Sequence, residues 1–171
     1  MNWIYYNPDK TNDGFECRYK IINGILYIES RGANSFWDWF KCIFWALWTC
    51  IIDGEKYHKY WGLLGFKFFR HIRRLNFQYV HLRGHSMGGA INDVVAKLLI
   101  TRSKKVIFSH KTFGSPKASL NTPELGTNYY NKGDFVRFLP FWYKPGNRVD
   151  TDKKWRPVWI SHKFYDWRFE E

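Results

Sequence analysis

The sequence predicts an α/β domain with a mixed, mostly parallel central sheet flanked by helices. The middle of the chain alternates strand and helix: a β-prone run at Tyr79–Arg83, a helical pattern at Ala90–Ile100 and a second strand-like run at Val106–Phe113. Earlier in the chain, an Asn-Gly pair between two strand-like runs adds an antiparallel hairpin to this alternation. The 171 residues suit one domain, over 1–171, with a substantial core.

The first half of the chain predicts a hairpin followed by two helices. Phe15–Ile22 and Ile25–Ser30 are the hairpin strands, and Asn23-Gly24 is the turn. Apolar residues at helical spacing predict helices over Phe36–Ile52 and Glu55–Leu75. The first of these helices has two interpretations: a core helix packed on the sheet, or an interfacial element or lid that exposes aromatic side chains to lipid.

The second half continues the alternating pattern. Tyr79–Arg83 and Val106–Phe113 flank the helix Ala90–Ile100, and Thr127–Asn131 is a further short strand. Phe135–Leu139 then leaves the sheet ahead of a proline. The remaining segments are turns and charged loops.

Composition limits the partners and the compartment. The net charge of +12 predicts attraction to anionic partners, and the 21% aromatic content with ten Trp suits a membrane interface as well as a core. The three cysteines form no disulfide framework. The N-terminal segment shows no signal-peptide pattern, and no run is long enough to span a bilayer, so we expect a cytoplasmic or peripheral membrane protein.

A nucleophile elbow is the motif around which the chain is organised. Gly84-His85-Ser86-Met87-Gly88 is a G-x-S-x-G placed between a predicted strand and a predicted helix. The turn lifts the Ser86 side chain above the sheet, and a Cβ at either glycine would strike a neighbouring strand or helix. The backbone N–H of Met87 and the helix N-terminus would lie beside the serine, where an oxyanion would form.

A serine nucleophile needs a base, and the base needs an orienting acid. On α/β-hydrolase scaffolds these follow the serine in the order acid, then histidine. Only His110 and His162 follow Ser86, and His110 lies inside a predicted strand before any suitable acid. Asp134 directly follows a predicted strand, which places it at the sheet edge where such sites form. We therefore predict the triad Ser86, Asp134 and His162.

Several segments between residues 25 and 163 occur together, in order, in one enzyme family. They are Leu26–Gly32, Asp38-Trp39, His58, Gly84–Ala90, Thr112–Lys117, Gly133–Val136 with Leu139-Pro140, and His162. This series resembles the class 3 (fungal-type) lipase family of α/β-hydrolases. Two departures stand out: Tyr60-Trp61 replaces the Gly-Phe that follows the histidine, and Ala33 replaces a serine or threonine.

The resemblance implies a compact α/β-hydrolase fold and a serine carboxylic-ester hydrolase, a lipase or phospholipase that works through an acyl-enzyme. It implies an oxyanion hole formed by the backbone of Ala33 and Met87, with no metal and no cofactor. The expected substrate is a lipid ester, and the positive charge adds peripheral contact with an anionic membrane surface.

Two other functions remain open at this point. One is a catalytically silent membrane- or nucleic-acid-binding module on a hydrolase scaffold, which the loss of a hydroxyl at Ala33 favours. The other is a soluble carboxylesterase without interfacial preference. Nucleic acid is not expected as a partner, because no recognised binding motif accompanies the basic residues.

Overall fold

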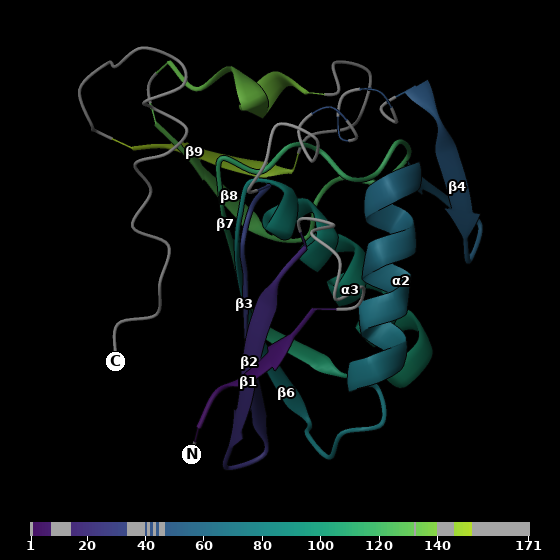
Figure 1. Cartoon of the computed structure of the whole chain (residues 1–171), viewed down its shortest axis with the longest axis vertical. Coiled ribbons are helices and arrows are strands. Elements are labelled where there is room, and N and C mark those ends of the chain that lie inside the picture. The colour runs from purple at the N-terminus through teal and green to yellow at the C-terminus, as the bar shows by residue number, and fades with distance from the viewer. Residues whose placement is uncertain are drawn as a thin grey trace.

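The computed structural model describes residues 2–7, 15–33, 40, 42, 44, 47–131, 133–139 and 146–151. A seven-stranded sheet forms the centre of this part of the molecule (Figure 1). In spatial order its strands are β1 (Ile4–Tyr6), β2 (Cys17–Ile22), β3 (Ile25–Ser30), β6 (Tyr79–His85), β7 (Val106–Phe113), β8 (Thr127–Tyr130) and β9 (Asn147–Asp150). β1, β2 and β3 pair antiparallel, and β3, β6, β7, β8 and β9 pair parallel. The mixed, mostly parallel sheet is therefore confirmed.

The hairpin predicted at the start of the sheet is also confirmed. Asn23 and Gly24 both adopt positive φ, at 50° and 74°, which two-residue hairpin turns require. β2 and β3 pair in full register from Ile22 opposite Ile25 to Cys17 opposite Ser30. The hairpin places the end of β3 beside the end of β6, where Ser30 pairs with Gly84.

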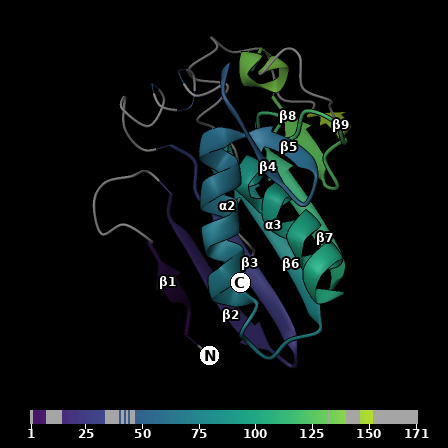
Figure 2. The same cartoon turned by 90° about the vertical axis from the view of Figure 1, so that its right-hand side faces the viewer.

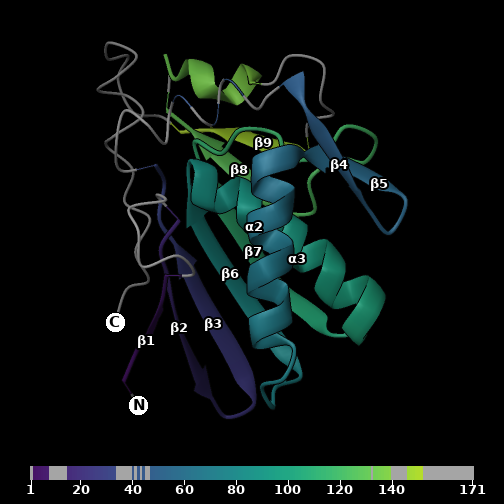
Figure 3. The ribbon, with the colours of Figure 1, turned by 45° about the vertical axis from the view of Figure 1, so that its right-hand side comes forward.

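Two helices cover one face of the sheet (Figures 2 and 3). They are α2 (Lys59–Ile72) and α3 (Met87–Ser103). α3 confirms the helix predicted at Ala90–Ile100 and extends it, because the elbow leads directly into its first turn. Both helices pack on buried strand residues such as Leu26, Val80 and Leu82, and this layer is the hydrophobic core. Apolar burial of this kind is the main stabilising term in such a fold.

The helix predicted at Glu55–Leu75 is confirmed from Lys59 to Ile72 as α2, but the structure corrects its start and the end of the helix predicted at Phe36–Ile52, because Glu55–His58 and Thr49–Ile52 are strands. A second hairpin stands where they were expected to meet, formed by β4 (Thr49–Ile52) and β5 (Glu55–His58). Asp53 and Gly54 form its turn with φ of 53° and 78°. This Asp-Gly pair is a strong hairpin signal. The helical spacing of the apolar residues around it was misleading.

The 3₁₀ helix η2 (Phe135–Phe138) follows β8 and lies above the sheet edge, as Phe135–Leu139 was expected to leave the sheet. Residues 36–39, 41, 43, 45 and 46 of the predicted helix Phe36–Ile52 lie outside the described residues, and so does the choice between core helix and lid that rests on them. Among the described residues, no helix is long and apolar enough to cross a membrane.

Candidate active site

Ser86 occupies the turn between β6 and α3 in a conformation that is rare for a residue with a side chain. Its φ is 51° and its ψ is −128°. Its backbone N–H donates to the carbonyl oxygen of Phe113 in the neighbouring strand, at 2.9 Å. Such strained backbones cost on the order of 1–3 kcal/mol and cluster at functional sites. The strain is therefore consistent with the predicted nucleophile elbow.

The two elbow glycines stand where a larger residue would not fit. A Cβ on Gly84 would lie 2.7 Å from the backbone N and Cα of Gly89 in α3. A Cβ on Gly88 would lie 2.4 Å from the carbonyl oxygen of Arg31 and 2.6 Å from that of Ser30. Both neighbours are backbone atoms that cannot move aside cheaply. The prediction that a Cβ at either glycine would collide with a neighbouring element is confirmed.

The turn after β3 passes close to Ser86. A Cβ on Gly32 would lie 2.7 Å from the Cβ of Ser86 and 3.2 Å from the carbonyl oxygen of His85. Ala33, the next residue, is half-buried against the core, and Met87 begins α3 on the other side of the serine. The structure therefore places Gly32, the residue before Ala33, against the predicted nucleophile, and Met87 directly follows that nucleophile in the chain.

Asp134 lies beyond the end of β8, at the same edge of the sheet as the elbow. β7 pairs with both strands, with Phe113 opposite His85 on one side and Tyr129 on the other. The carboxylate is 1% exposed and its Oδ1 accepts from the backbone N–H of Val136 at 3.0 Å. This contact caps η2 and orients the side chain.

The third predicted triad residue, His162, lies outside the described residues. The other histidine downstream of the serine is His110, which is buried within β7 opposite Leu82. Burial lowers the pKa of His110 below its ordinary value. Its position before the strand end agrees with its exclusion as the base.

A buried polar network fixes the loop behind the elbow. Ser115 donates its backbone N–H to Oδ1 of Asn128 at 3.2 Å, and its carbonyl oxygen accepts from Asn128 Nδ2 and Tyr130 Oη at 2.8 and 2.7 Å. Gly89 of α3 packs directly on Ser115, since a Cβ there would lie 2.8 Å from the serine side chain. The Thr112–Lys117 motif therefore packs against the first turn of α3, next to the elbow.

Asn92 is a supporting residue that the sequence analysis did not identify. It is fully buried in α3, where its Oδ1 accepts from Ser30 Oγ at 2.7 Å and its Nδ2 donates to the Arg83 carbonyl oxygen at 3.0 Å. These bonds join the ends of β3 and β6 to the helix that follows the serine. The available signal was a polar residue on an otherwise buried helix face.

His58 is a second residue whose role the sequence did not reveal. It ends β5, is fully buried, and its Nε2 lies 2.9 Å from the carbonyl oxygen of Cys42. Burial lowers its pKa to about 4, so at neutral pH the ring is uncharged and donates from Nε2. Cys42 Sγ in turn contacts Met87 Sδ at 3.5 Å and accepts from Trp61 Nε1 at 3.4 Å. Cys42 is thus held against the first residue of α3.

Exposed apolar side chains precede and follow Cys42 in the sequence. Phe40 and Phe44 are 48% and 55% exposed, and their rings stack at 5.6 Å. Leu47, Trp48 and Ile51 are also exposed, at 78%, 55% and 66%. These five residues are called the apolar rim below. Exposed apolar groups in such number are typical of surfaces that contact other molecules.

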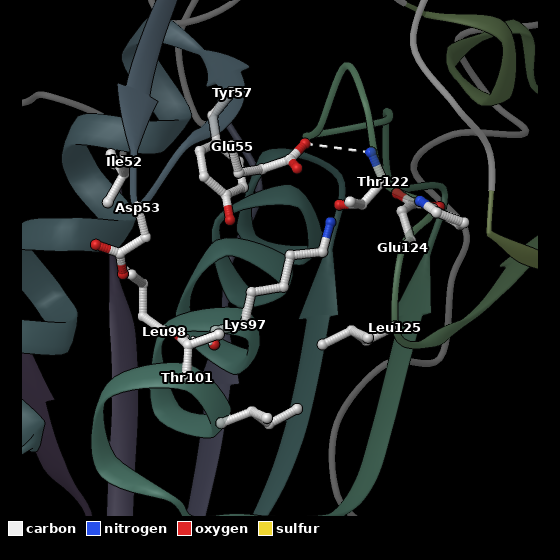
Figure 4. Close-up of a pocket in the computed structure, with 12 residues that line it drawn as sticks. Ile52, Asp53, Glu55, Tyr57, Lys97, Leu98, Thr101, Thr122, Glu124 and Leu125 are labelled. Atoms are coloured by element: carbon white, nitrogen blue, oxygen red, sulfur yellow. Dashed lines mark hydrogen bonds between the residues drawn. The ribbon is translucent and has the colours of Figure 1, made fainter.

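A separate groove of about 420 Å³ lies between α3, the β4–β5 hairpin and residues 122–125 (Figure 4). Its lining includes Lys97, which pairs with Asp93 at 2.9 Å, and the buried side chain of Glu124. Burial and the nearby charge of Asp93 raise the pKa of Glu124 to about 8. Among the predicted site residues that the structure describes, none lines this groove, so it is distinct from the surroundings of Ser86.

Comparisons with known proteins place the fold. No family model matches the chain, and no curated protein matches its sequence. Among solved structures, the native Rhizomucor miehei lipase propeptide complex has a TM-score of 0.60 at 17% identity, over 90% of this chain and 56% of that chain. Lip2 lipase from Yarrowia lipolytica has a TM-score of 0.56 at 14% identity, over 94% and 69% of the two chains. A triacylglycerol lipase from Penicillium expansum has a TM-score of 0.58 at 14% identity, over 88% and 68%.

These similarities show the α/β-hydrolase fold of the fungal lipases. The resemblance to class 3 lipases that the motifs indicated is therefore confirmed at the level of the fold. The chain spans only 52% to 63% of the length of three further lipase chains that it matches.

Proposed function

We propose that the protein is a serine carboxylic-ester hydrolase that acts on lipid esters through an acyl-enzyme. The observation that carries this proposal is the strained Ser86 at the elbow, with the turn at Gly32 packed against its Cβ. The fold is that of fungal lipases, and one of the similar solved structures is described as a triacylglycerol lipase whose catalytic centre is a serine protease triad.

In the proposed mechanism Ser86 Oγ attacks the ester carbonyl while His162 takes its proton and Asp134 orients the imidazole. The backbone N–H groups of Ala33 and Met87 stabilise the oxyanion of the tetrahedral intermediate. The protonated His162 then protonates the departing alcohol, which leaves the acyl group on the serine. Water, activated by the same histidine, releases the acid. The mechanism requires neither a metal nor a cofactor.

The apolar rim supports a lipid substrate and peripheral contact with a membrane. Cys42, which lies between Phe40 and Phe44 in the sequence, contacts Met87 of the proposed oxyanion hole. Aromatic and aliphatic side chains of this kind partition into the lipid interface, and the net charge of +12 favours an anionic one. A lipase or phospholipase would meet its substrate on this side.

Hydrolysis of p-nitrophenyl esters of increasing chain length, with and without micelles, tests the proposal. We expect activity that rises when long-chain esters form micelles and that disappears in Ser86→Ala. Ser103→Ala, at the far end of α3, is the matched control and should retain full activity. Full activity in Ser86→Ala would refute the mechanism.

Two results would select the alternatives. Equal activity on dissolved and micellar esters would identify a soluble carboxylesterase without interfacial preference. No hydrolysis of any ester, with a folded protein, would favour a silent binding module. That alternative draws on Ala33, whose side chain offers no hydroxyl to hold an oxyanion-hole donor in place.

A further inference from the structure

The helix α2 packs on the sheet with one side and turns the other side to solvent, where its surface is hollowed (Figures 2 and 3). The hollow has a volume of about 290 Å³ and is lined by Phe66, Lys67, Arg70, His71 and Arg74. It is called the α2 depression below. Arg73, the C-cap, keeps helical dihedral angles, with φ of −57° and ψ of −20°. Arg70 and Arg74 are therefore neighbours on the same side of the helix, and both are exposed.

The arginines at the end of α2 have no acidic partner in the described part of the chain. No aspartate or glutamate lies between Glu55 and Asp93 in the sequence. Among the residues that the structure describes, Arg70, Arg73 and Arg74 form no ion pair. A helix side that faces only water commonly carries charges of both signs, whereas the exposed side of α2 carries cations alone.

One acidic residue from another element comes close to this side of α2, and its charge is already used. The guanidinium of Arg102 lies 5.1 Å from the centre of the Phe66 ring. Arg102 donates from Nε to Oδ2 of Asp53 at 2.6 Å. This hydrogen bond holds the pKa of the Asp53 carboxyl below its ordinary value. Asp53 therefore compensates Arg102 and leaves the charge of the α2 depression unbalanced.

His71 is held in place at one edge of the α2 depression. Its Nε2 lies 2.8 Å from Tyr19 Oη, and its ring lies 4.6 Å from the ring of Tyr6. Partial burial, and in addition the positive charge of Arg74, lowers the pKa of His71, so the imidazole is uncharged at neutral pH. When Nε2 accepts from the Tyr19 hydroxyl, Nδ1 carries the proton and can donate to an anion.

The helix dipole accounts for only part of this pattern. Cations in the last turn of a helix are favoured by the dipole, and Arg70 lies in the last turn of α2. Arg70 and Arg74 are, however, four residues apart, a spacing at which like charges destabilise a helix. An anion bound between the two guanidinium groups would replace this repulsion with attraction. The α2 depression therefore suits an anionic ligand, in keeping with the net charge of +12.

We propose that the α2 depression binds phosphate monoester groups, with Arg70 and Arg74 on the phosphate oxygens and His71 as a further donor. The planar guanidinium fork matches two oxygens of a phosphate, and a monoester carries a charge of about −1.5 to −2 at pH 7. Two arginines compensate that charge better than the single charge of a diester. The same group occurs in small soluble phosphate esters and in the headgroup of phosphatidic acid.

This site is separate from the candidate active site and independent of the proposed esterase activity. The chain passes from α2 into the start of β6, whereas Ser86 follows the end of β6. β6 has seven residues and is therefore about 20 Å long. The α2 depression and Ser86 thus lie towards opposite ends of the sheet (Figure 3).

Two binding measurements on the full chain test the proposal. One is calorimetric titration with glycerol 3-phosphate, a soluble monoester. The other is sedimentation with phosphatidylcholine vesicles that contain either phosphatidic acid, a monoester, or phosphatidylglycerol, a diester, at equal total charge. We expect binding to the monoester that weakens at least about tenfold in Arg74→Gln, from the loss of one charge-assisted contact. Arg73→Gln removes the same charge from the same end of α2 but lies outside the lining, so this matched control should change affinity far less.

The two measurements also distinguish the sources of the phosphate. Binding of glycerol 3-phosphate would assign the α2 depression to soluble esters. Preference for phosphatidic acid vesicles without binding of glycerol 3-phosphate would assign it to a lipid headgroup. Any contribution of the apolar rim is the same for both kinds of vesicle.

Two outcomes would overturn the proposal. One is an equal loss of affinity in Arg73→Gln and Arg74→Gln, which would indicate diffuse attraction to the positive charge. The other is absence of glycerol 3-phosphate binding together with equal retention on the two kinds of vesicle. Circular dichroism of each variant shows whether it is folded, and Arg70→Gln provides a second test if Arg74→Gln is not.

Discussion

Gly32 is the residue whose size matters most to the candidate site. Because Gly32 has no side chain, the turn after β3 can lie close to Ser86. A Cβ added at Gly32 would lie 2.7 Å from the Cβ of Ser86. Ala33 follows it, and in the proposed mechanism its backbone N–H stabilises the oxyanion without help from a side-chain hydroxyl. The close approach of the turn at Gly32 and a hydroxyl at position 33 would contribute separately to stabilising the oxyanion. Substitutions at Gly32 and at Ala33 therefore measure the two contributions one at a time.

Gly32→Ala is expected to reduce kcat for ester hydrolysis by at least about 100-fold, the loss typical of one oxyanion-hole donor, because the methyl group would push the turn away from the serine. Steady-state kinetics on a soluble ester measures this loss. Ala33→Ser keeps the close approach and should retain or raise kcat. Unchanged kcat in Gly32→Ala would place the oxyanion elsewhere.

His58 makes stability depend on pH. Its pKa is about 4 in the folded protein, below the ordinary value of 6.5, so between these values the unfolded chain binds more protons. The contribution of His58 is therefore complete above about pH 6.5 and is lost as the pH falls towards 4, by roughly 3 kcal/mol. His58→Gln keeps a donor for the Cys42 carbonyl and does not titrate.

Denaturant unfolding at pH 7 and pH 5 compares the two proteins. The free energy of unfolding should fall more steeply with decreasing pH in the wild type than in His58→Gln. Equal slopes would show that His58 is not buried uncharged.

At the scale of elements, the β4–β5 hairpin and the apolar rim form a part of the molecule distinct from the sheet. Trp48 and Ile51 are exposed, and β5 ends at the buried His58. The hairpin therefore presents apolar side chains on one side and is anchored near the elbow on the other. This arrangement predicts that the rim affects contact with lipid and leaves the chemistry of the serine unchanged.

The double variant Trp48→Ser/Ile51→Ser should hydrolyse short dissolved esters like the wild type and emulsified esters at least about fivefold more slowly, because it loses apolar area at the interface. Leu63→Ser, which removes an exposed leucine from α2, is the control and should leave both rates unchanged. Equal loss on dissolved and emulsified esters would contradict a role confined to the interface.

At the scale of the whole molecule, the sequence predicted what local chemistry determines. We could predict the elbow glycines, the Asn23-Gly24 hairpin and the strand–helix alternation, because each depends on residues that are neighbours in the sequence. The β4–β5 hairpin was missed because apolar residues on both sides of Asp53-Gly54 also fit helical spacing. The edge strands β1 and β9 were missed because they are short, mostly exposed and defined by their pairing with the neighbouring strand.

Contacts between distant segments could not be predicted from the sequence. The approach of Gly32 to Ser86 joins β3 to β6, and Asn92 joins both strands to α3. The fold brings these residues together, although they are far apart in the sequence.

The measurement that tests the central claim most directly is intact mass after reaction with a fluorophosphonate probe, which labels only activated serines. We expect one adduct that maps to Ser86 and is lost in both Ser86→Ala and His162→Ala, because the hydroxyl alone is a weak nucleophile. Asp134→Asn should label much more slowly, since the imidazole would lose its orienting carboxylate. An adduct that persists in His162→Ala at the wild-type rate, or no adduct on the folded protein, would contradict the proposed triad.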